Sequence, residues 1–392
     1  MPWETRTVTM NRKEFVEEVQ AGEKSKSQIC REYGISRVTG EKWIKRSESG
    51  EGYEDRSRAP FHTANKTSPE KEAKVLAVRG THPAWGPRKI RQFLINKGET
   101  DLPANSTICN ILRRNGCISE EASRAATPYK RFQKEHCNEM WQTDFKGHFA
   151  MKDGNRCHPL TVLDDCTRFS LCVDAKENEQ RTGVVQSFER LFAEYGLPDA
   201  LLCDHGNPLG NSQTTAYSVF EVWLMERDIL PIHGRIRHPQ TQGKEERFHR
   251  TLNVELLKLK EIENMEHAQK CFDEFRYCYN HERPHEALNL GVPALFYHPS
   301  RRTVPDRIQH WEYDDGCVLR KVKSTGYLTF MGQGYYISES FGGQTLAVRS
   351  SSSVEGCYDI LFRGFRVAQL NPYERVLISR RISRAAAPPE NE

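Results

Sequence analysis

The sequence predicts a multidomain α+β protein, with a helical front, a mixed α/β middle and a carboxy-terminal stretch of short strands. Three observations support this. Apolar residues recur at helical spacing over residues 1–118, strands alternate with helices over 137–300, and short glycine-punctuated strands follow in 301–372. A chain of 392 residues is long enough for several domains, each with its own core.

Charge is divided unevenly along the chain, although the net charge is only +4. Residues 1–136 hold 26 Lys and Arg against 18 Asp and Glu, residues 137–300 hold 18 against 25, and residues 301–392 hold 13 against 10. A basic amino-terminal part followed by an acidic middle is typical of DNA-binding modules beside a carboxylate-rich site. A multidomain protein can also show such a division by chance, so the pattern is supporting evidence only.

The twelve cysteines are scattered and form no C-x-x-C pair, which argues against a zinc site and favours free thiols in a reducing compartment. No apolar run approaches the length of a membrane span, and the first residues contain no apolar signal region. We therefore expect a cytoplasmic protein without a membrane partner.

Residues 1–50 predict a helix-turn-helix DNA-binding domain. A helix over 11–20 and a second helix capped by Ser25 precede a tight glycine turn, and a third helix with a polar and basic start begins at Arg37. A generic three-helix bundle is the alternative. Gly40 weakens the third helix by about 1 kcal/mol relative to alanine. The expected DNA contacts here are Arg37, Thr39, Lys42, Lys45 and Arg46.

A second helical unit is expected in residues 68–118, after a Ser-, Gly- and Glu-rich linker over 51–67. Its last helix, capped by Ser106, indicates a second, diverged helix-turn-helix domain. Residues 119–136 predict a basic linker that either lies along phosphates or is a solvated tether. The expected DNA contacts of this part are Thr107, Arg113, Arg114, Lys130 and Arg131.

Three carboxylates of the acidic middle, residues 137–300, lie in or at the ends of predicted strands and helices. Asp144 lies within a strand predicted over 140–149, and Asp204 ends a buried strand of the parallel type. Glu246 lies on the first turn of a helix that follows the breakers Pro239 and Gly243. That helix start, taken alone, is an ordinary amphipathic one.

Converging carboxylates repel one another, and a divalent cation relieves the repulsion. A buried strand aspartate is costly unless it is paired or binds a metal. Oxygen ligands with open water positions suit Mg²⁺ or Mn²⁺ rather than zinc. Two such ions can activate a water or a 3′-hydroxyl and stabilise the leaving oxygen of a phosphodiester.

Four motifs occur in a fixed order: Trp141-Gln142-Thr143-Asp144, Asp204-His205-Gly206, Pro239-Gln240-Thr241-Gln242-Gly243-Lys244-Glu245-Glu246, and the stretch from Tyr279 to Leu288. With the paired helix-turn-helix front, this order resembles the retroviral-integrase-like DDE transposases of bacterial insertion sequences. The resemblance covers most of the chain.

The resemblance implies an RNase H-like catalytic core over residues 137–300, in which Asp144, Asp204 and Glu246 hold the metal. The implied cofactor is Mg²⁺, with Mn²⁺ as a substitute and two ions per site. The family's glutamate stands three residues after the glycine, which selects Glu246 over Glu245. Two departures stand out: 41 residues separate the second aspartate from the glutamate, more than is usual in the family, and the zinc-binding module of retroviral members is missing.

The implied partners are double-stranded DNA, as transposon ends with terminal inverted repeats and as target, and further copies of the chain, at least a dimer. The implied location is the bacterial nucleoid. DNA contacts near the scissile phosphate are expected from Gln242, Lys244, Arg247 and Arg250. Several other residues keep two interpretations each: Asp164 and Asp165 as turn residues or ligands, His205 and His249 as phosphate-orienting or packing residues, and Arg283 and His285 as supports of the site or DNA contacts.

Residues 301–372 predict a small antiparallel β-barrel, and residues 373–392 predict a disordered tail. Two other functions compete with a transposase. One is a non-catalytic DNA-binding regulator, against which the intact carboxylate trio argues. The other is a metal-dependent nuclease without strand transfer, for which two sequence-reading modules are unnecessary.

Overall fold

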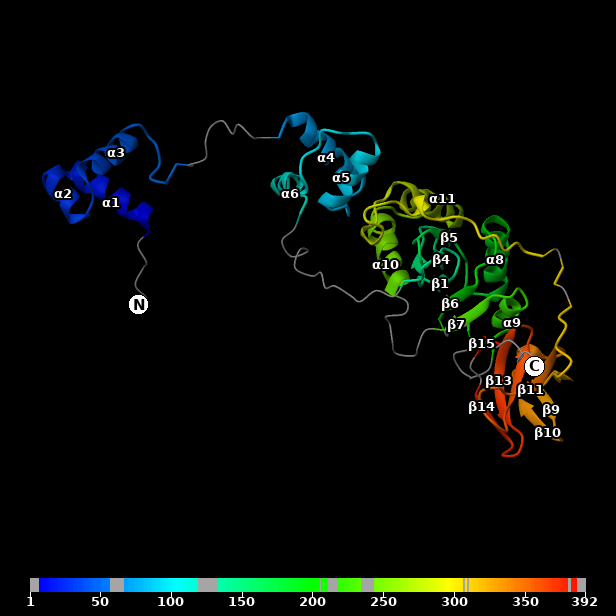
Figure 1. Cartoon of the computed structure of the whole chain (residues 1–392). Coiled ribbons are helices and arrows are strands. Elements are labelled where there is room, and N and C mark those ends of the chain that lie inside the picture. Colours follow the sequence, from blue (N-terminus) through cyan, green and yellow to red (C-terminus); the bar gives the residue numbers. More distant parts are fainter. Residues whose placement is uncertain are drawn as a thin grey trace. The chain divides into compact units, whose positions relative to one another are not determined.

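The structure is a computed structural model of the chain (Figure 1). It describes residues 7–56, 67–118, 133–204, 206, 208–210, 217–233, 243–305, 307–308, 310–379 and 382–385. The chain divides into two compact units, Met1–Lys66 and Thr67–Glu392. Within the described ranges, no helix has the length and apolarity needed to cross a membrane.

The first unit is a three-helix domain of α1 (Val8–Ala21), α2 (Lys26–Glu32) and α3 (Arg37–Glu48), as predicted. Ser36 caps α3, because its side chain accepts a hydrogen bond from the backbone N–H of Thr39. The core of the unit is formed by Phe15, Val16, Ile29, Cys30, Trp43 and Ile44. Residues 51–56, expected as linker, instead pack back on the helices: Arg12 donates to the carbonyl oxygen of Tyr53 and to Asp55.

Gly40 is required by the packing of α3. A Cβ at this position would lie 2.7 Å from Cys30 Sγ and 2.9 Å from Phe15 Cζ. The missing side chain at Gly40 lowers the helix propensity of α3, but it permits the close approach of α3 to α1 and α2.

The second unit begins with another three-helix domain, formed by α4 (Pro69–Thr81), α5 (Pro87–Asn96) and α6 (Asn105–Arg114). We call it the second helical domain. Trp85, Ile90, Ile108, Ile111 and Leu112 are buried in its core. The helix α6 begins two residues earlier than predicted, with Ala104 rather than Ser106 at its N-cap position.

A mixed five-stranded sheet follows, in the order β5-β4-β1-β6-β7. Its strands are β1 (Trp141–Phe145), β4 (Leu160–Asp164), β5 (Ser170–Asp174), β6 (Ala200–Cys203) and β7 (Leu230–His233). The strands β1, β4 and β5 pair antiparallel, and β1, β6 and β7 pair in parallel. This is the RNase H-like arrangement that the resemblance implies. A short hairpin of β2 (Phe149–Ala150) and β3 (Arg156–Cys157) was not predicted.

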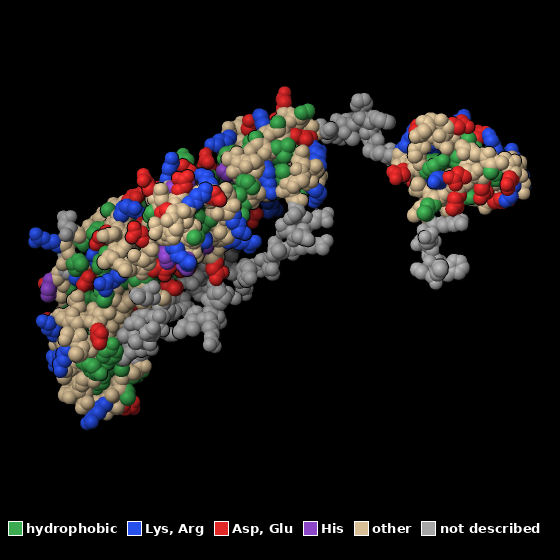
Figure 2. All heavy atoms as spheres, turned by 180° about the vertical axis from the view of Figure 1, so that it is seen from behind, with side chains coloured by type: hydrophobic (Ala, Val, Ile, Leu, Met, Phe, Trp, Pro, Cys, Tyr) green, Lys and Arg blue, Asp and Glu red, His purple; other side chains and the backbone are tan. Residues whose placement is uncertain are grey.

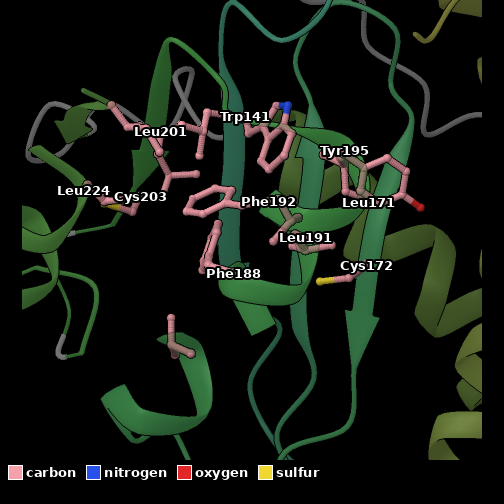
Figure 3. Packing of buried hydrophobic residues seen from close by; sticks show 14 of the residues in the cluster. Trp141, Leu171, Cys172, Phe188, Leu191, Phe192, Tyr195, Leu201, Cys203 and Leu224 are labelled. Atoms are coloured by element: carbon pink, nitrogen blue, oxygen red, sulfur yellow. The ribbon is translucent and has the colours of Figure 1, made fainter. Parts of the chain in front are cut away.

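Helices cover both faces of this sheet (Figure 1). On one face, α8 (Arg181–Tyr195) and α9 (Val219–Met225) pack on alternate strand residues, and Figure 3 shows Phe188 and Phe192 against Trp141 and Leu201. On the other face lie α10 (Gly243–Leu252), its π-helical continuation η2 (Asn253–Leu257), and α11 (Met265–Tyr277). Helix α11 was not predicted from the sequence. A second π-helical turn, η3 (Cys278–Glu282), continues α11.

The carboxy-terminal region is an antiparallel sheet that packs on α9 of the core. Its order is β14-β13-β12-β11-β8, with β15 beside β13 and a separate hairpin of β9 and β10. Tyr217 and Met225 of the core belong to the same apolar cluster as Val348 and Ile360 of this sheet. Its strands are β8 (Val318–Lys321), β9 (Tyr327–Phe330), β10 (Gln333–Tyr336), β11 (Thr345–Ser350), β12 (Tyr358–Phe362), β13 (Phe365–Asn371), β14 (Val376–Ser379) and β15 (Ser383–Arg384).

Of two predictions for this region, the β-barrel is not confirmed and the disordered tail is wrong for part of its length. Within the described residues no hydrogen-bonded ladder joins the hairpin to the larger sheet, so a closed barrel is not confirmed. The tail predicted to be disordered from residue 373 contributes β14 and β15, because both pair with β13 and Arg384 forms an ion pair with Asp228 of the core, 2.6 Å apart.

Candidate active site

Sheet register places Asp144 beside Asp204. In the parallel ladder of β1 and β6, Gln142 is paired with Leu202. Asp144 and Asp204 each lie two residues further along, at the carboxyl ends of adjacent strands. Neighbouring parallel strands end at the same edge of a sheet, so the two aspartates share that edge. Asp144 is the last but one residue of β1, rather than the middle residue of a longer strand.

Helix α10 places its two adjacent glutamates in opposite environments. Phe248 and Leu252 are buried in the core beneath the helix, and Glu245 lies on the same side because it precedes them by three and seven residues. The side chain of Glu245 is 0% exposed, whereas Glu246 is exposed. Only Glu246 is thus open to a ligand or to DNA.

The pKa of Asp144 responds to burial and to neighbouring negative charges. It is raised to about 7, first by burial and then by the negative charge of Asp204, with smaller contributions from Glu179 and Glu246. The backbone N–H of Phe145 opposes the shift. A carboxyl group whose pKa is raised in this way has too little positive charge around it to stabilise its ionised form.

A buried polar cluster behind Asp144 was missed by the sequence analysis. Thr161, the strand partner of Asp144, has its Oγ1 3.0 Å from Glu245 Oε2 and 2.8 Å from His249 Nε2. His249 Nδ1 lies 3.9 Å from Asp144 Oδ2. Burial, and then the charge of Asp144, hold the pKa of Glu245 well above its ordinary value, while burial lowers the pKa of His249 to about 4. These shifts favour the neutral form of each group, and His249 is a packing and hydrogen-bonding residue.

The three candidate carboxylates suit a hard divalent cation in their chemistry, although their side chains do not lie close enough together to hold one. Within the described part of the chain, no three His, Cys, Asp or Glu side chains lie close enough to hold a metal ion. The candidates Asp144, Asp204 and Glu246 offer oxygen only, as Mg²⁺ prefers. The raised pKa of Asp144 expresses a repulsion that such an ion would relieve.

Asp164 and Asp165 are structural. Asp164 accepts hydrogen bonds from the backbone N–H groups of Asn138 (2.8 Å) and Thr167 (2.7 Å). Asp165, whose side chain is 0% exposed, forms an ion pair with Lys244 and accepts from Gln142. Burial, and then the charge of Arg168, lower the pKa of Lys244 to about 8. Lys244 is thus tied to the core beside the site.

Profiles of known families match three parts of the chain. Integrase core domain families match residues 134–239 and 227–293. A Helix-turn-helix domain family matches residues 11–61, and a Homeodomain-like domain family matches residues 39–112. The core matches cover the sheet edge with Asp144 and Asp204 and the helix with Glu246.

Two similar proteins come from bacterial insertion elements. The chain is 26% identical over 256 residues to the 31.7 kDa protein of insertion element IS407 from Burkholderia multivorans, which covers 63% of this chain and 88% of that protein. It is 24% identical over 247 residues to the 39.2 kDa protein of insertion element IS476 from Xanthomonas euvesicatoria, covering 61% and 69%. The chain is an integrase-like transposase.

Solved integrases show similarity at lower identity. The HTLV-2 integrase catalytic core domain in complex with magnesium is 16% identical to the transposase, covers 42% of it and 100% of its own chain, and gives a TM-score of 0.33. A chain of the simian T-cell lymphotropic virus intasome in complex with PP2A regulatory subunit B56 gamma is 16% identical, covers 81% and 99%, and gives a TM-score of 0.37.

The candidate DNA contacts of the transposase differ in their surroundings. On the two helix-turn-helix domains, Arg37, Lys42, Lys45 and Arg113 are exposed. Thr39 is half-buried beside Ser36. Arg46 forms an ion pair with Glu51 at 3.2 Å and lies over the ring of Trp43. Arg114 forms an ion pair with Glu72. Thr107 is half-buried, Arg247 and Arg250 are exposed on α10, and Lys130, Arg131, His205 and Gln242 lie outside the described residues. Figure 2 shows basic and acidic side chains interspersed on one face of the second unit.

Arg283 and His285 are buried rather than directed at DNA. Arg283 forms an ion pair with Glu255, with 3.0 Å between Nη2 and Oε1. His285 Nε2 lies 3.1 Å from the carbonyl oxygen of Tyr279, and burial lowers the pKa of His285 to about 3. Of the two interpretations left open, the structure supports a supporting role for both residues.

Proposed function

We propose that the transposase binds the terminal inverted repeats of its own insertion sequence, cleaves the DNA there and joins the 3′ ends to a target. Its helix-turn-helix domains would hold double-stranded DNA, and at least two copies of the chain would bring both ends together at the nucleoid. The observation that carries the proposal is the position of Asp144 and Asp204 at the carboxyl ends of the adjacent parallel strands β1 and β6 of the integrase core.

In this proposal Asp144, Asp204 and Glu246 hold Mg²⁺, or Mn²⁺ in its place, with two ions in each site. Bound metal would supply a polarised water or 3′-hydroxyl and stabilise the leaving oxygen of the phosphodiester. The chain's own contribution is to fix the carboxylates on a rigid sheet edge and helix, and to favour the neutral forms of Glu245 and His249 behind them. Exposed Arg247 and Arg250 lie on the same helix as Glu246 and would contact phosphates.

The test is a cleavage and strand-transfer assay on labelled duplexes that carry the ends of the element. Wild-type protein is compared with Glu246→Gln, with and without Mg²⁺. We expect Mg²⁺-dependent cutting and joining by the wild type, and loss of both in the variant while end binding persists.

Each alternative outcome identifies a rival. Specific binding without cutting by the wild type would indicate the non-catalytic regulator. Cutting without any joining would indicate the nuclease. Persistent activity in Glu246→Gln would show that the assignment of the glutamate is wrong.

A further inference from the structure

One carboxylate on the continuation of the catalytic helix is held by donors from two distant segments. Glu255 lies on η2, which follows α10 without a break. Its Oε2 accepts a hydrogen bond from Trp85 Nε1 at 3.2 Å, and its Oε1 accepts from Arg283 Nε and Nη2, each at 3.0 Å. The side chain of Glu255 is 13% exposed and that of Arg283 is 10% exposed. Such charge-assisted bonds between largely buried groups are directional and strong.

Trp85 belongs to the second helical domain, so this hydrogen bond joins that domain to the core. The Trp85 residue is 0% exposed and its ring stacks on His82, with 3.8 Å between ring centroids. Two further contacts cross between the same parts. Lys97 Nζ lies 3.1 Å from Glu282 Oε1, and Cys278 of η3 packs against the apolar core of the second helical domain.

Glu255 also compensates positive charge at this contact. Lys89 of α5 is half-buried, and its pKa is lowered to about 8, first by burial and then by the charge of Arg283, while Glu255 acts in the opposite direction. Glu286 and Arg247 also act on Lys89, with opposite signs. If the charge of Glu255 is removed, Arg283 and Lys89 lose a shared counter-ion, and separation of the two parts is favoured.

We propose that Glu255 is a positioning residue, which docks the second helical domain on the helix that carries Glu246 and thereby sets which phosphate of a bound DNA end meets the carboxylates. This rests on the proposed function. Glu255 follows Glu246 by nine positions, about 13 Å along a helix. Because successive nucleotides of a strand are about 3.4 Å apart along duplex DNA, a domain displaced by a few ångströms presents a neighbouring phosphate.

The first test maps cleavage positions at nucleotide resolution with the full chain and a labelled end duplex. Glu255→Gln keeps the shape of the side chain without its charge, and Trp85→Phe removes the ring N–H. The matched control is Glu274→Gln, because Glu274 forms an exposed ion pair with Lys260 away from this contact. We expect end affinity within twofold of wild type for all three variants.

The distribution of cuts distinguishes positioning from stability. In Glu255→Gln we expect at least a tenfold loss of cutting at the wild-type phosphate and new cuts one or two nucleotides away, with a smaller change in Trp85→Phe and none in Glu274→Gln. Unchanged positions, with a rate that falls only in proportion to the folded fraction, would overturn the proposal. Lys97→Glu and Glu282→Lys should each broaden the distribution of cleavage positions. The double variant, which exchanges the two charges across the contact, should restore the wild-type cleavage positions.

A second measurement is independent of catalysis. Hydrogen–deuterium exchange of the DNA-free full chain should rise in Glu255→Gln at residues 84–97 and 253–257 together, while α8 stays as protected as in the wild type. If neither segment changes, the docking role is wrong even where wild-type protein cuts DNA. If wild-type protein does not cut but both segments respond, docking stands and the proposed function fails.

Discussion

Glu245 and Glu246 are neighbours on the first turn of α10, yet the side chain of Glu245 is enclosed and accepts a hydrogen bond from Thr161, whereas Glu246 is exposed. A glutamate in full burial is uncommon unless it is paired, and Glu245 Oε1 finds no hydrogen-bond partner among the described residues. Burial, and then the charge of Asp144, hold the pKa of Glu245 well above its ordinary value, which favours the protonated form. The two carboxyl groups therefore respond differently to the same substitution.

Glu245→Gln should leave catalysis nearly intact. A protonated glutamate and a glutamine have almost the same shape, and both can hydrogen-bond Thr161. We expect the cleavage rate to change by no more than about threefold, less than 1 kcal/mol of barrier. Single-turnover cleavage beside Glu246→Gln checks this, and a Glu245→Gln variant as inactive as Glu246→Gln would contradict the proposed division of roles.

Asp144→Asn should stabilise the metal-free protein at alkaline pH. The folded-state pKa of Asp144, about 7, lies above its ordinary value of 3.8, so the stability from its protonation is complete below about pH 4 and is lost as pH rises through 7. At pH 8 in EDTA we expect the variant to be more stable by roughly 1–3 kcal/mol, with no difference near pH 4.

Thermal unfolding at both pH values measures this difference. Added Mg²⁺ should then raise the melting temperature of the wild type more than that of Asp144→Asn, because only the wild type keeps all three carboxylates. An equal response of the two proteins to Mg²⁺ would contradict the proposed role of Asp144 as a ligand.

Gly40→Ala should destabilise the first unit despite the better helix propensity of alanine. The added methyl group meets Cys30 and Phe15 at less than 3 Å, so α3 must move or its neighbours must repack. Overpacking of this kind costs about 1–3 kcal/mol. Gly80→Ala is the matched control, because Gly80 lies in α4 with no atom within 4 Å, and there alanine should stabilise by about 0.5–1 kcal/mol. Urea unfolding measures both changes, and a stabilised Gly40→Ala variant would refute the packing argument.

Lys244→Ala should lower stability more than DNA affinity. It leaves the enclosed carboxylate of Asp165 without its cation, which costs about 2–4 kcal/mol when a buried pair loses one partner. Arg250→Ala removes an exposed charge on the same helix and should cost less than about 0.5 kcal/mol. The opposite order is expected for DNA, where Arg250→Ala should reduce the salt dependence of binding by about one unit of slope. Equal unfolding free energies for the two variants would count against the Lys244–Asp165 pair.

Much of the site was accessible from the sequence, because it depends on local pattern. Helical spacing and glycine turns predicted α1 to α3 closely, and apolar runs predicted β4, β5 and β6. The residues Phe248, Leu252 and Leu256 form a buried stripe on α10 and η2, and its extension by one turn towards the amino terminus reaches Glu245. That signal distinguishes the two glutamates by burial, independently of the family register.

The order of the modules, the helix-turn-helix pattern and the three candidate carboxylates can be read from the sequence, since periodicity and turn residues act between near neighbours in the chain. Three features depend on the folded chain: Lys244 pairs with Asp165, Thr161 and His249 enclose Glu245, and Glu255 accepts hydrogen bonds from Trp85 and Arg283. Trp85 and Glu255 are 170 residues apart. Partners at such separations are chosen by the packing of whole elements, which brings a donor and an acceptor together where burial makes an unpaired charge costly.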